Sequence, residues 1–194
     1  MIRDIASLLR ARDAGEPLQF LYFWGHRSRR GRPPGKEVLS QWYMASFTHD
    51  GVHYASAEHW MMAEKARLFG DDAALQAVLA APTPAAAKKE GRQVAGFSPE
   101  GWAAHCVDIV VRGNVLKFAQ NPALLAYLLS TGPLVLVEAA PNDAIWGIGM
   151  AQDAEGVGDP RRWRGTNLLG FALMEARHRL ARPDPPGHGT PRHS

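Results

Sequence analysis

Three stretches of the chain combine acidic, basic and aromatic side chains at short spacing, and chemistry is expected there. The first runs from Tyr54 to Lys65 and carries Glu58 near the start of an apolar helical pattern. At helical spacing, Glu58, Met62 and Lys65 share one face. The Glu58 carboxylate is either a partner of the helix dipole, which lowers its pKa, or a catalytic group in a buried pocket, which raises it.

The second stretch is Pro141-Asn-Asp143-Ala-Ile-Trp146-Gly147-Ile-Gly149, directly after a predicted strand. Loops at strand ends often carry functional residues, so Asp143 and Trp146 are candidates. A simple turn stabilised by local Asn and Asp hydrogen bonds is the alternative interpretation. The glycines do not form a dinucleotide-binding fingerprint, because no third glycine opens a helix after them.

The third stretch covers residues 161–170 and contains three arginines, Trp163, Thr166 and Asn167. Thr166 or Asn167 can cap the last helix, and the free backbone N–H groups of that helix would then suit a phosphate. The arginines just upstream, Arg164 among them, would add to the attraction. A capped helix with exposed arginines explains the same residues equally well.

The composition places these stretches in an ordinary globular chain. The chain has 194 residues, of which 46% are hydrophobic and 21% are charged, values typical of one folded domain. No apolar run approaches the ~18–20 residues that span a bilayer, and no secretory leader is present, so we expect a cytoplasmic protein without a membrane partner. The single Cys106 excludes an internal disulfide framework, and its apolar neighbours favour a buried filler over a nucleophile.

The positive charge is concentrated in a few places. The net charge is +3, and residues 27–36 carry five cations and no acid. Such groups attract phosphate, although from charge alone solvated loops are the favoured interpretation, and no aromatic pattern of a base-stacking platform accompanies them. Residues 183–194 are rich in proline and glycine and are predicted to be a disordered C-terminal tail, which leaves 1–182 as the folded domain.

Periodicity and turn signals predict a mainly α (α+β) fold, a compact helical domain with a small sheet. Helices are expected over 2–12, 56–69, 71–81, from Thr83 onward, 100–119, 122–130 and 166–181. Strands are expected over 18–24, as a buried aromatic run, and over 133–139, with a hairpin at 47–54 around Asp50-Gly51. These strands are too few and too scattered for a doubly wound parallel sheet.

Taken together, the acids, tryptophans and arginines suit a nucleotide-like ligand. An indole offers a flat face to a base, and a guanidinium group offers a fork to a phosphate. Carboxylates stabilise an oxocarbenium-like centre or activate a water at a glycosidic bond. This chemistry needs no cofactor and no metal, and His59 with Glu64 does not form a zinc signature.

Five pieces of the sequence resemble the NADAR (YbiA-like) family, and the resemblance extends from about Phe20 to Leu180. The pieces are Phe23-Trp-Gly-His26, Leu39-Ser-Gln-Trp-Tyr43, Ser56-Ala-Glu-His-Trp60 with Lys65, Asn142-Asp-Ala-Ile-Trp-Gly147, and Trp163-Arg-Gly-Thr-Asn167. The resemblance implies a compact, mainly helical N-glycosidase. YbiA-type members cleave the N-glycosidic bond of phosphorylated early riboflavin intermediates, ribosylamino-pyrimidines, and release ribose 5-phosphate.

Two alternatives stand beside this function. Other members of the family remove ADP-ribose from modified guanine in nucleic acid, which the basic 27–36 segment mildly favours. A non-catalytic ADP-ribose or NAD-binding module would use the same aromatic and basic residues without requiring the acids. Departures from the usual family pattern at Ser40-Gln41-Trp42 and in the 27–36 segment bear on the substrate more than on the reaction. A monomer and an oligomer fit the sequence equally well.

The resemblance assigns roles to individual residues. Glu58 matches the catalytic carboxylate, and Asp143 matches a second polar group at the ribose. Lys65 and Arg92 lie where the family has basic residues, and they or the 161–164 arginines would hold phosphate. The implied substrate-binding residues are Trp102, Trp146, Lys65, Arg92, Asn167, Trp163 and Arg164.

Overall fold

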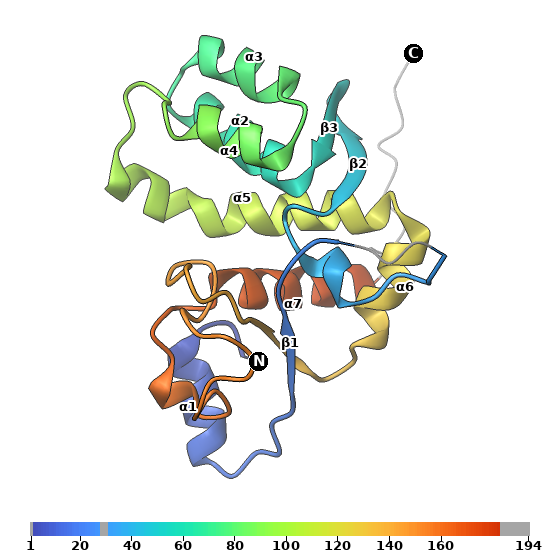
Figure 1. Cartoon of the computed structure of the whole chain (residues 1–194), viewed down its shortest axis with the longest axis vertical. Coiled ribbons are helices and arrows are strands. Elements are labelled where there is room, and N and C mark those ends of the chain that lie inside the picture. Colours follow the sequence, from blue (N-terminus) through green and yellow to red (C-terminus); the bar gives the residue numbers. More distant parts are fainter. Residues whose placement is uncertain (1, 28–30, 183–194) are drawn as a thin grey trace, which may run out of the picture.

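Seven α-helices, two short 3₁₀ helices and two small sheets build the part of the chain that the computed structural model describes, residues 2–27 and 31–182 (Figure 1). The helices are α1 (Ile5–Asp13), α2 (Ala57–Leu68), α3 (Asp72–Ala80), α4 (Pro84–Gly91), α5 (Pro99–Ala119), α6 (Pro122–Ser130), α7 (Leu168–Ala181), η1 (Lys36–Leu39) and η2 (Pro160–Arg162). The strands are β1 (Phe20–Phe23), β2 (Met44–His49), β3 (Val52–Ser56) and β4 (Val135–Glu138). The predicted mainly helical α+β class is confirmed. The predicted tail 183–194 and residues 28–30 of the basic segment lie outside the described residues.

Side-chain caps set where most helices begin. The capping residues, each accepting a hydrogen bond from a backbone N–H three residues ahead, are Asp4, Ser56, Asp71, Thr83 and Ser98. Each side-chain oxygen satisfies a donor that the helix itself leaves free. The first helix therefore begins after Asp4, and the prediction that it begins at residue 2 was three residues too early.

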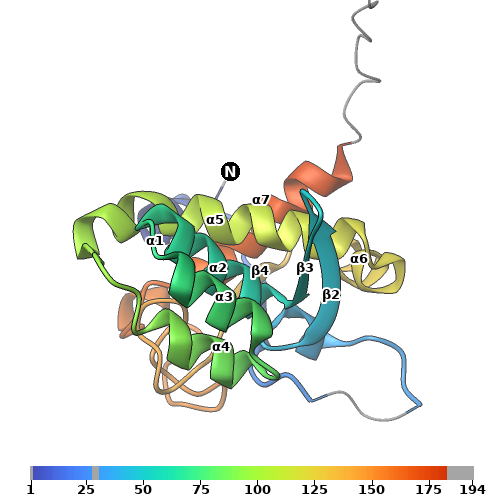
Figure 2. The same cartoon turned by 90° about the horizontal axis from the view of Figure 1, so that it is seen from above.

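The long helix α5 lies at the centre of the fold. On one side it contacts α2, which packs against α3 and α4 beside the hairpin of β2 and β3 (Figure 2). On its other side α7 runs along it and contacts β4 (Figure 1). The larger hydrophobic core surrounds the fully buried Trp60, and a smaller core around Leu8 and Phe171 joins α1, the β1–β4 sheet and α7. Among the described residues, no helix is long and apolar enough to cross a membrane.

The parallel pairing of β1 with β4 brings two distant segments to one sheet edge. Phe20 pairs with Val135 and Phe23 pairs with Glu138, so the residues that follow both strands emerge side by side. The predicted buried run 18–24 was too long at its end, because Trp24 lies beyond the last pair and is 61% exposed. The strand thus ends where the chain turns outward, and its continuation is free to line a site.

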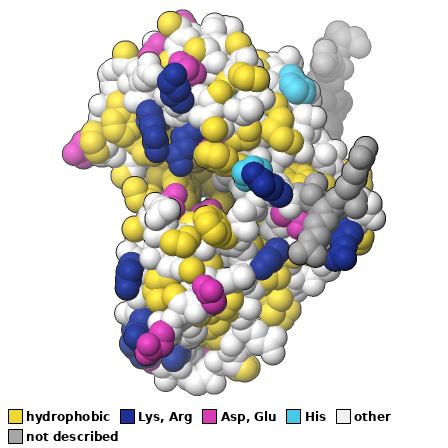
Figure 3. Space-filling model, viewed as in Figure 1, with side chains coloured by type: hydrophobic (Ala, Val, Ile, Leu, Met, Phe, Trp, Pro, Cys, Tyr) yellow, Lys and Arg dark blue, Asp and Glu magenta, His cyan; other side chains and the backbone are white. Residues whose placement is uncertain are grey.

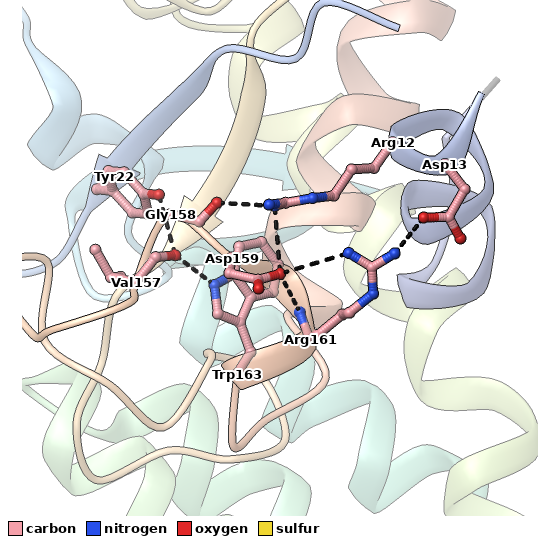
Figure 4. Close-up of polar contacts among 8 residues, drawn as sticks. All are labelled: Arg12, Asp13, Tyr22, Val157, Gly158, Asp159, Arg161 and Trp163. Carbon is pink, nitrogen blue, oxygen red and sulfur yellow. Dashed lines mark hydrogen bonds and ion pairs between the residues drawn. The ribbon is translucent and has the colours of Figure 1, made fainter. Parts of the chain in front are cut away.

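A polar cluster attaches α1 to the loop before η2 (Figure 4). Arg12 donates to the carbonyl of Gly158 at 3.1 Å and pairs with Asp159 at 3.3 Å. Arg161 pairs with both Asp13 and Asp159. The arginine at 161 therefore has acidic partners within the fold.

We predict that Gly113→Ala destabilises the protein where α5 crosses α2. A Cβ at Gly113 would lie 2.3 Å from the indole of Trp60, which is fully buried and hydrogen-bonded to the carbonyl of Ile109. Such overpacking costs about 1–3 kcal/mol. Gly101→Ala, in the same helix, is the control, because its Cβ would meet its neighbours at 3.4 Å. Denaturant unfolding should show a lower free energy of unfolding for Gly113→Ala only. Equal unfolding midpoints for the two variants would contradict the close approach of Gly113 to Trp60.

Candidate active site

A cavity of about 420 Å³ opens where the ends of β1 and β4 meet α4. Four segments supply its walls, and the lining residues are Trp24, Gly25, His26, Ser40, Trp42, Lys88, Glu138, Ala140, Asn142 and Asp143. Figure 3 shows a hollow on this face of the molecule with acidic side chains on its floor and lysine and arginine side chains on the rim above it. The volume is in the range of small-ligand pockets.

Glu58 lies enclosed beside this cavity. Its residue is 2% exposed, and its backbone N–H donates to the carbonyl of Gln41 at 3.0 Å. Burial raises the pKa of its carboxyl to about 7, while Lys88 and a hydrogen bond from Trp42, both on the cavity wall, act in the opposite direction. Burial therefore outweighs these opposing contacts, and the pKa is raised, as expected for a group in a buried pocket. Oε1 has no hydrogen-bond partner among the described residues, as expected of a carboxyl held for a ligand rather than for the fold.

A second carboxyl, that of the partly buried Glu138, lines the cavity and was missed by the sequence analysis. It is the last residue of β4, and its Oε2 is enclosed without a hydrogen-bond partner in the described part of the chain. Burial raises the pKa of this carboxyl to about 8, and the neighbouring acids Asp143 and Glu58 add to the shift. Its place at the carboxyl end of a strand, just before the 141–149 stretch, was the signal that could have identified it.

Asp143 both stabilises the turn after β4 and lines the cavity. Its Oδ1 accepts the backbone N–H groups of Ile145 at 2.9 Å and Trp146 at 2.8 Å, as the turn interpretation expected. The same residue lines the cavity and acts electrostatically on both Glu58 and Glu138. Trp146 is half-buried and packs against the larger core, so its indole contributes to the packing of the fold.

Basic and aromatic side chains gather near the end of α4. Lys88 is on the cavity wall, and Arg92, the exposed cap residue of α4, is close enough to influence both Glu58 and Lys65 electrostatically. Lys65 donates to the carbonyl of Gly91 at 2.8 Å, and its Nζ lies 5.8 Å from the ring centre of Trp102. Burial, and then Arg92, lower the pKa of Lys65. The structure thus groups Lys65, Arg92 and Trp102, and their contact with a substrate stays a prediction.

The third sequence stretch plays a structural part instead of binding phosphate at a helix end. Asn167 is fully buried; its Oδ1 accepts the N–H of Glu138 at 2.9 Å and its Nδ2 donates to the carbonyl of Leu136 at 3.0 Å. The N–H groups of Leu168 and Leu169 are already bonded to carbonyls of the 145–146 turn. The expectation of free N–H groups at the start of α7 was therefore wrong.

Trp163 and Arg164 also lie apart from the carboxyls. The indole N–H of Trp163 donates to the carbonyl of Val157 at 2.7 Å (Figure 4). Its ring packs edge-on against Phe20 in the smaller core. Arg164 is exposed, and its backbone bonds to Ile148. Neither residue lines the cavity, so the structure does not bring them together with the other predicted site residues.

Helix α5 holds the segment that carries Trp42. The buried Lys117 donates to the carbonyls of Val38 at 2.7 Å and Ser40 at 2.9 Å, and Asn114 donates to the side chain of Gln41 at 2.9 Å. The carbonyl of Gln41 in turn receives the N–H of Glu58. The sequence analysis used residues 39–43 as one piece of the family resemblance and noted a departure at 40–42, but it did not predict that this segment bonds to the backbone of Glu58.

This arrangement can provide both an acid and a base near neutral pH. The pKa of Glu138, which lines the cavity, is raised to about 8, and the pKa of Glu58, which lies beside the lining residues Lys88 and Trp42, is raised to about 7. Groups that titrate near the working pH are efficient in proton transfer, and unequal surroundings divide the two roles. The indoles of Trp24 and Trp42 on the walls can contact a flat base.

Comparisons with known proteins agree with the resemblance read from the sequence. Residues 22–181 match the NADAR domain. The chain is 40% identical over 165 residues to N-glycosidase R617 of Acanthamoeba polyphaga mimivirus, covering 82% of this chain and 95% of that protein. It is 33% identical over 132 residues to N-glycosidase YbiA of Escherichia coli K12, covering 68% and 74%. The NMR structure of E. coli YbiA superposes with a TM-score of 0.65 at 26% identity and covers 84% of this chain and 85% of that one.

The matched region contains the cavity, from Trp24 to Asp143, and the carboxyls of both Glu58 and Glu138. A match of this extent, together with relatives that share a third or more of their residues over most of their length, leaves one conclusion. The chain belongs to the NADAR domain family.

Proposed function

We propose that this protein hydrolyses the N-glycosidic bond of a phosphorylated ribosylamino-pyrimidine and releases ribose 5-phosphate. The reaction class, N-glycoside hydrolysis, rests on membership of the NADAR family and on relatives named N-glycosidases. The observation that carries the proposal is a pair of carboxyls that each have an enclosed oxygen without a partner in the described structure. Glu138 lines the cavity, and Glu58 lies behind the wall, where Lys88, Trp42 and Asp143 of the lining act on it.

The chemistry of the bond explains what such carboxyls would do. When the base departs, positive charge develops at the anomeric carbon of the ribose. An ionised Glu58 stabilises that charge or orients the attacking water. Lys88 on the wall, with Arg92 and Lys65 beyond it, supplies positive charge for the phosphate, and the indole of Trp42 supplies a face for the base.

A further relative supports a pyrimidine substrate of the riboflavin route. The chain is 34% identical over 110 residues to "Riboflavin biosynthesis protein PYRR, chloroplastic" of Zea mays. The match covers 55% of this chain and 16% of that longer protein. A domain of this kind inside a riboflavin biosynthesis protein favours a substrate drawn from the same chemistry.

ADP-ribosylated guanine is the second candidate, because a basic hollow adjoins the cavity. This hollow, of about 630 Å³, shares Trp24, Gly25 and His26 with the cavity and is lined by Arg27, Arg32 and Lys36. Three cations at this place could receive the additional phosphates of a larger substrate. A non-catalytic ADP-ribose module is disfavoured, because recognition alone gives no reason to bury two carboxyls without partners.

Separate incubations with the two substrates distinguish them. We expect ribose 5-phosphate and free base from the phosphorylated ribosylamino-pyrimidine, quantified by chromatography. Faster release of ADP-ribose from ADP-ribosylated guanine in an oligonucleotide would shift the assignment to the second candidate. Binding of ADP-ribose by calorimetry without any product from either substrate would favour the binding module.

Glu58→Gln should abolish most turnover while the protein stays folded. Removing one electrostatic stabiliser of a transition state costs roughly 10²–10³-fold in kcat, and glutamine keeps the shape of the buried side chain. Glu64→Gln on the same helix is the control, because Glu64 pairs with Arg67 at 2.5 Å away from the cavity. Initial rates and thermal melts of both variants test this. Wild-type rates in Glu58→Gln would show that the carboxylate has no catalytic part.

Arg92→Gln should weaken substrate binding more than it slows chemistry. Arg92 is exposed at the end of α4, where a screened charge contributes to holding the phosphate. We expect a KM several-fold higher with kcat nearly unchanged, and a smaller difference at high salt. Lys89→Gln removes the same charge from the exposed side chain next to Lys88 and should leave KM unchanged. Equal effects of the two variants would mean that only the net charge matters.

A further inference from the structure

We propose that Glu138 is a second catalytic residue, the acid that protonates the departing base, and this inference rests on the proposed N-glycosidase function. No sequence motif pointed to Glu138, and the assignment comes from its place in the structure. It is the only carboxyl that both lines the cavity and has a buried oxygen without a partner in the described part of the chain.

The backbone of Glu138 is fixed from three sides. β1 pairs with it through Phe23, the side chain of Asn167 accepts its N–H at 2.9 Å, and the N–H of Ile148 donates to its carbonyl at 2.9 Å. A Cβ at Gly147 would lie 2.9 Å from that same carbonyl oxygen. The loop that contains Gly147 and Ile148 therefore lies close against Glu138. Because the backbone of Glu138 is fixed, the position from which its side chain extends is fixed as well.

The charges around Glu138 favour its neutral form. Asp143 of the following loop and Glu58 of α2 raise its pKa, and Lys88 of α4 acts in the opposite direction. His26 lines the same cavity from the segment after β1. Like charges at short range do not ionise together, so one carboxyl of such a group retains its proton.

The surroundings divide the two roles. Lys88 and Asp143 act on both carboxyls, but for Glu58 the strongest neighbours are Lys88 and the hydrogen bond from Trp42, which favour its carboxylate form. Glu138 has acids as its strongest electrostatic neighbours, and the pKa of about 8 against about 7 agrees with this order. Glu138 therefore carries the proton at neutral pH, while Glu58 is the group that ionises first.

The proton and electron balance follows from these states. The bond between the anomeric carbon and the nitrogen of the base breaks, and its electron pair goes to the nitrogen, which takes the proton of Glu138. The oxygen of a water adds to the anomeric carbon and gives its proton to the Glu58 carboxylate. Glu138 ends as a carboxylate and Glu58 as an acid, and exchange with solvent restores the starting forms.

The pH dependence of turnover tests the assignment in the full chain. The kcat/KM of the wild-type protein on the phosphorylated ribosylamino-pyrimidine should fall above a midpoint near the pKa of about 8. Glu138→Gln should be at least about 10²-fold slower and should lose this alkaline fall. Glu138→Asp keeps an acid and should restore part of the rate. Glu175→Gln, on α7 away from the cavity, should match the wild type.

A rate for Glu138→Gln close to that of the wild type, or an unchanged alkaline fall, would overturn the proposal. A direct titration separates this outcome from a failure of the proposed function. Carbon-13 NMR of glutamate-labelled, ligand-free protein should show a carboxyl titrating near pH 8 that disappears in Glu138→Gln. Absence of turnover in the wild type would refute the proposed substrate. A Glu138 carboxyl that titrates near its ordinary pKa of about 4.3 would instead refute its role as the proton donor.

Unfolding supplies a readout independent of any substrate. A carboxyl with a raised folded-state pKa contributes stability that is fully present below its unfolded pKa of about 4.3 and is lost as the pH rises toward about 8. The melting temperature of Glu138→Gln relative to the wild type should therefore increase across this window and level off above it. A difference that stays constant with pH would contradict a protonated Glu138.

Discussion

The parallel pairing of β1 with β4 is the constraint on which the site depends. It places Trp24 to His26 and Glu138 to Asp143, more than a hundred positions apart in the sequence, at one sheet edge. The side chain of Asn167 bonds to the backbone of β4 on both sides of Val137, so α7 and the sheet are fixed as one unit. Opposite them, α2 and α4 bring Glu58 and Lys88, and the cavity lies at the meeting of the two halves.

Burial then gives the carboxyls their chemical character. A carboxylate without a partner is expensive inside a protein, so desolvation shifts Glu58 and Glu138 toward their neutral forms. Lys88 and Asp143 act on both groups, and their proton affinities are separated because only Glu58 accepts a hydrogen bond from Trp42 and because acids are the strongest electrostatic neighbours of Glu138. The support for this arrangement lies outside the cavity, in the contacts of Lys117 and Asn114 with residues 38–41.

Local features of the structure were readable from the sequence, and long-range ones were not. Helix starts followed from capping residues such as Ser56 and Thr83, because a cap depends on neighbours three positions away. The Asp50-Gly51 hairpin followed from turn chemistry. Glu138 ended an apolar strand pattern, and Asn167 looked like a helix cap, because their partners lie 29 residues apart and meet only through the sheet. The resemblance to the NADAR family supplied Glu58 and Asp143, which composition alone had left open.

We propose that one cavity holds a ribose phosphate between two carboxyls of different proton affinity. A crystal structure of the protein with ribose 5-phosphate tests this most directly. We expect the anomeric carbon to lie between the carboxyl groups of Glu58 and Glu138, with the phosphate turned toward Lys88 and Arg92. A sugar bound in the neighbouring basic hollow at Arg32, with both carboxyls untouched, would contradict it.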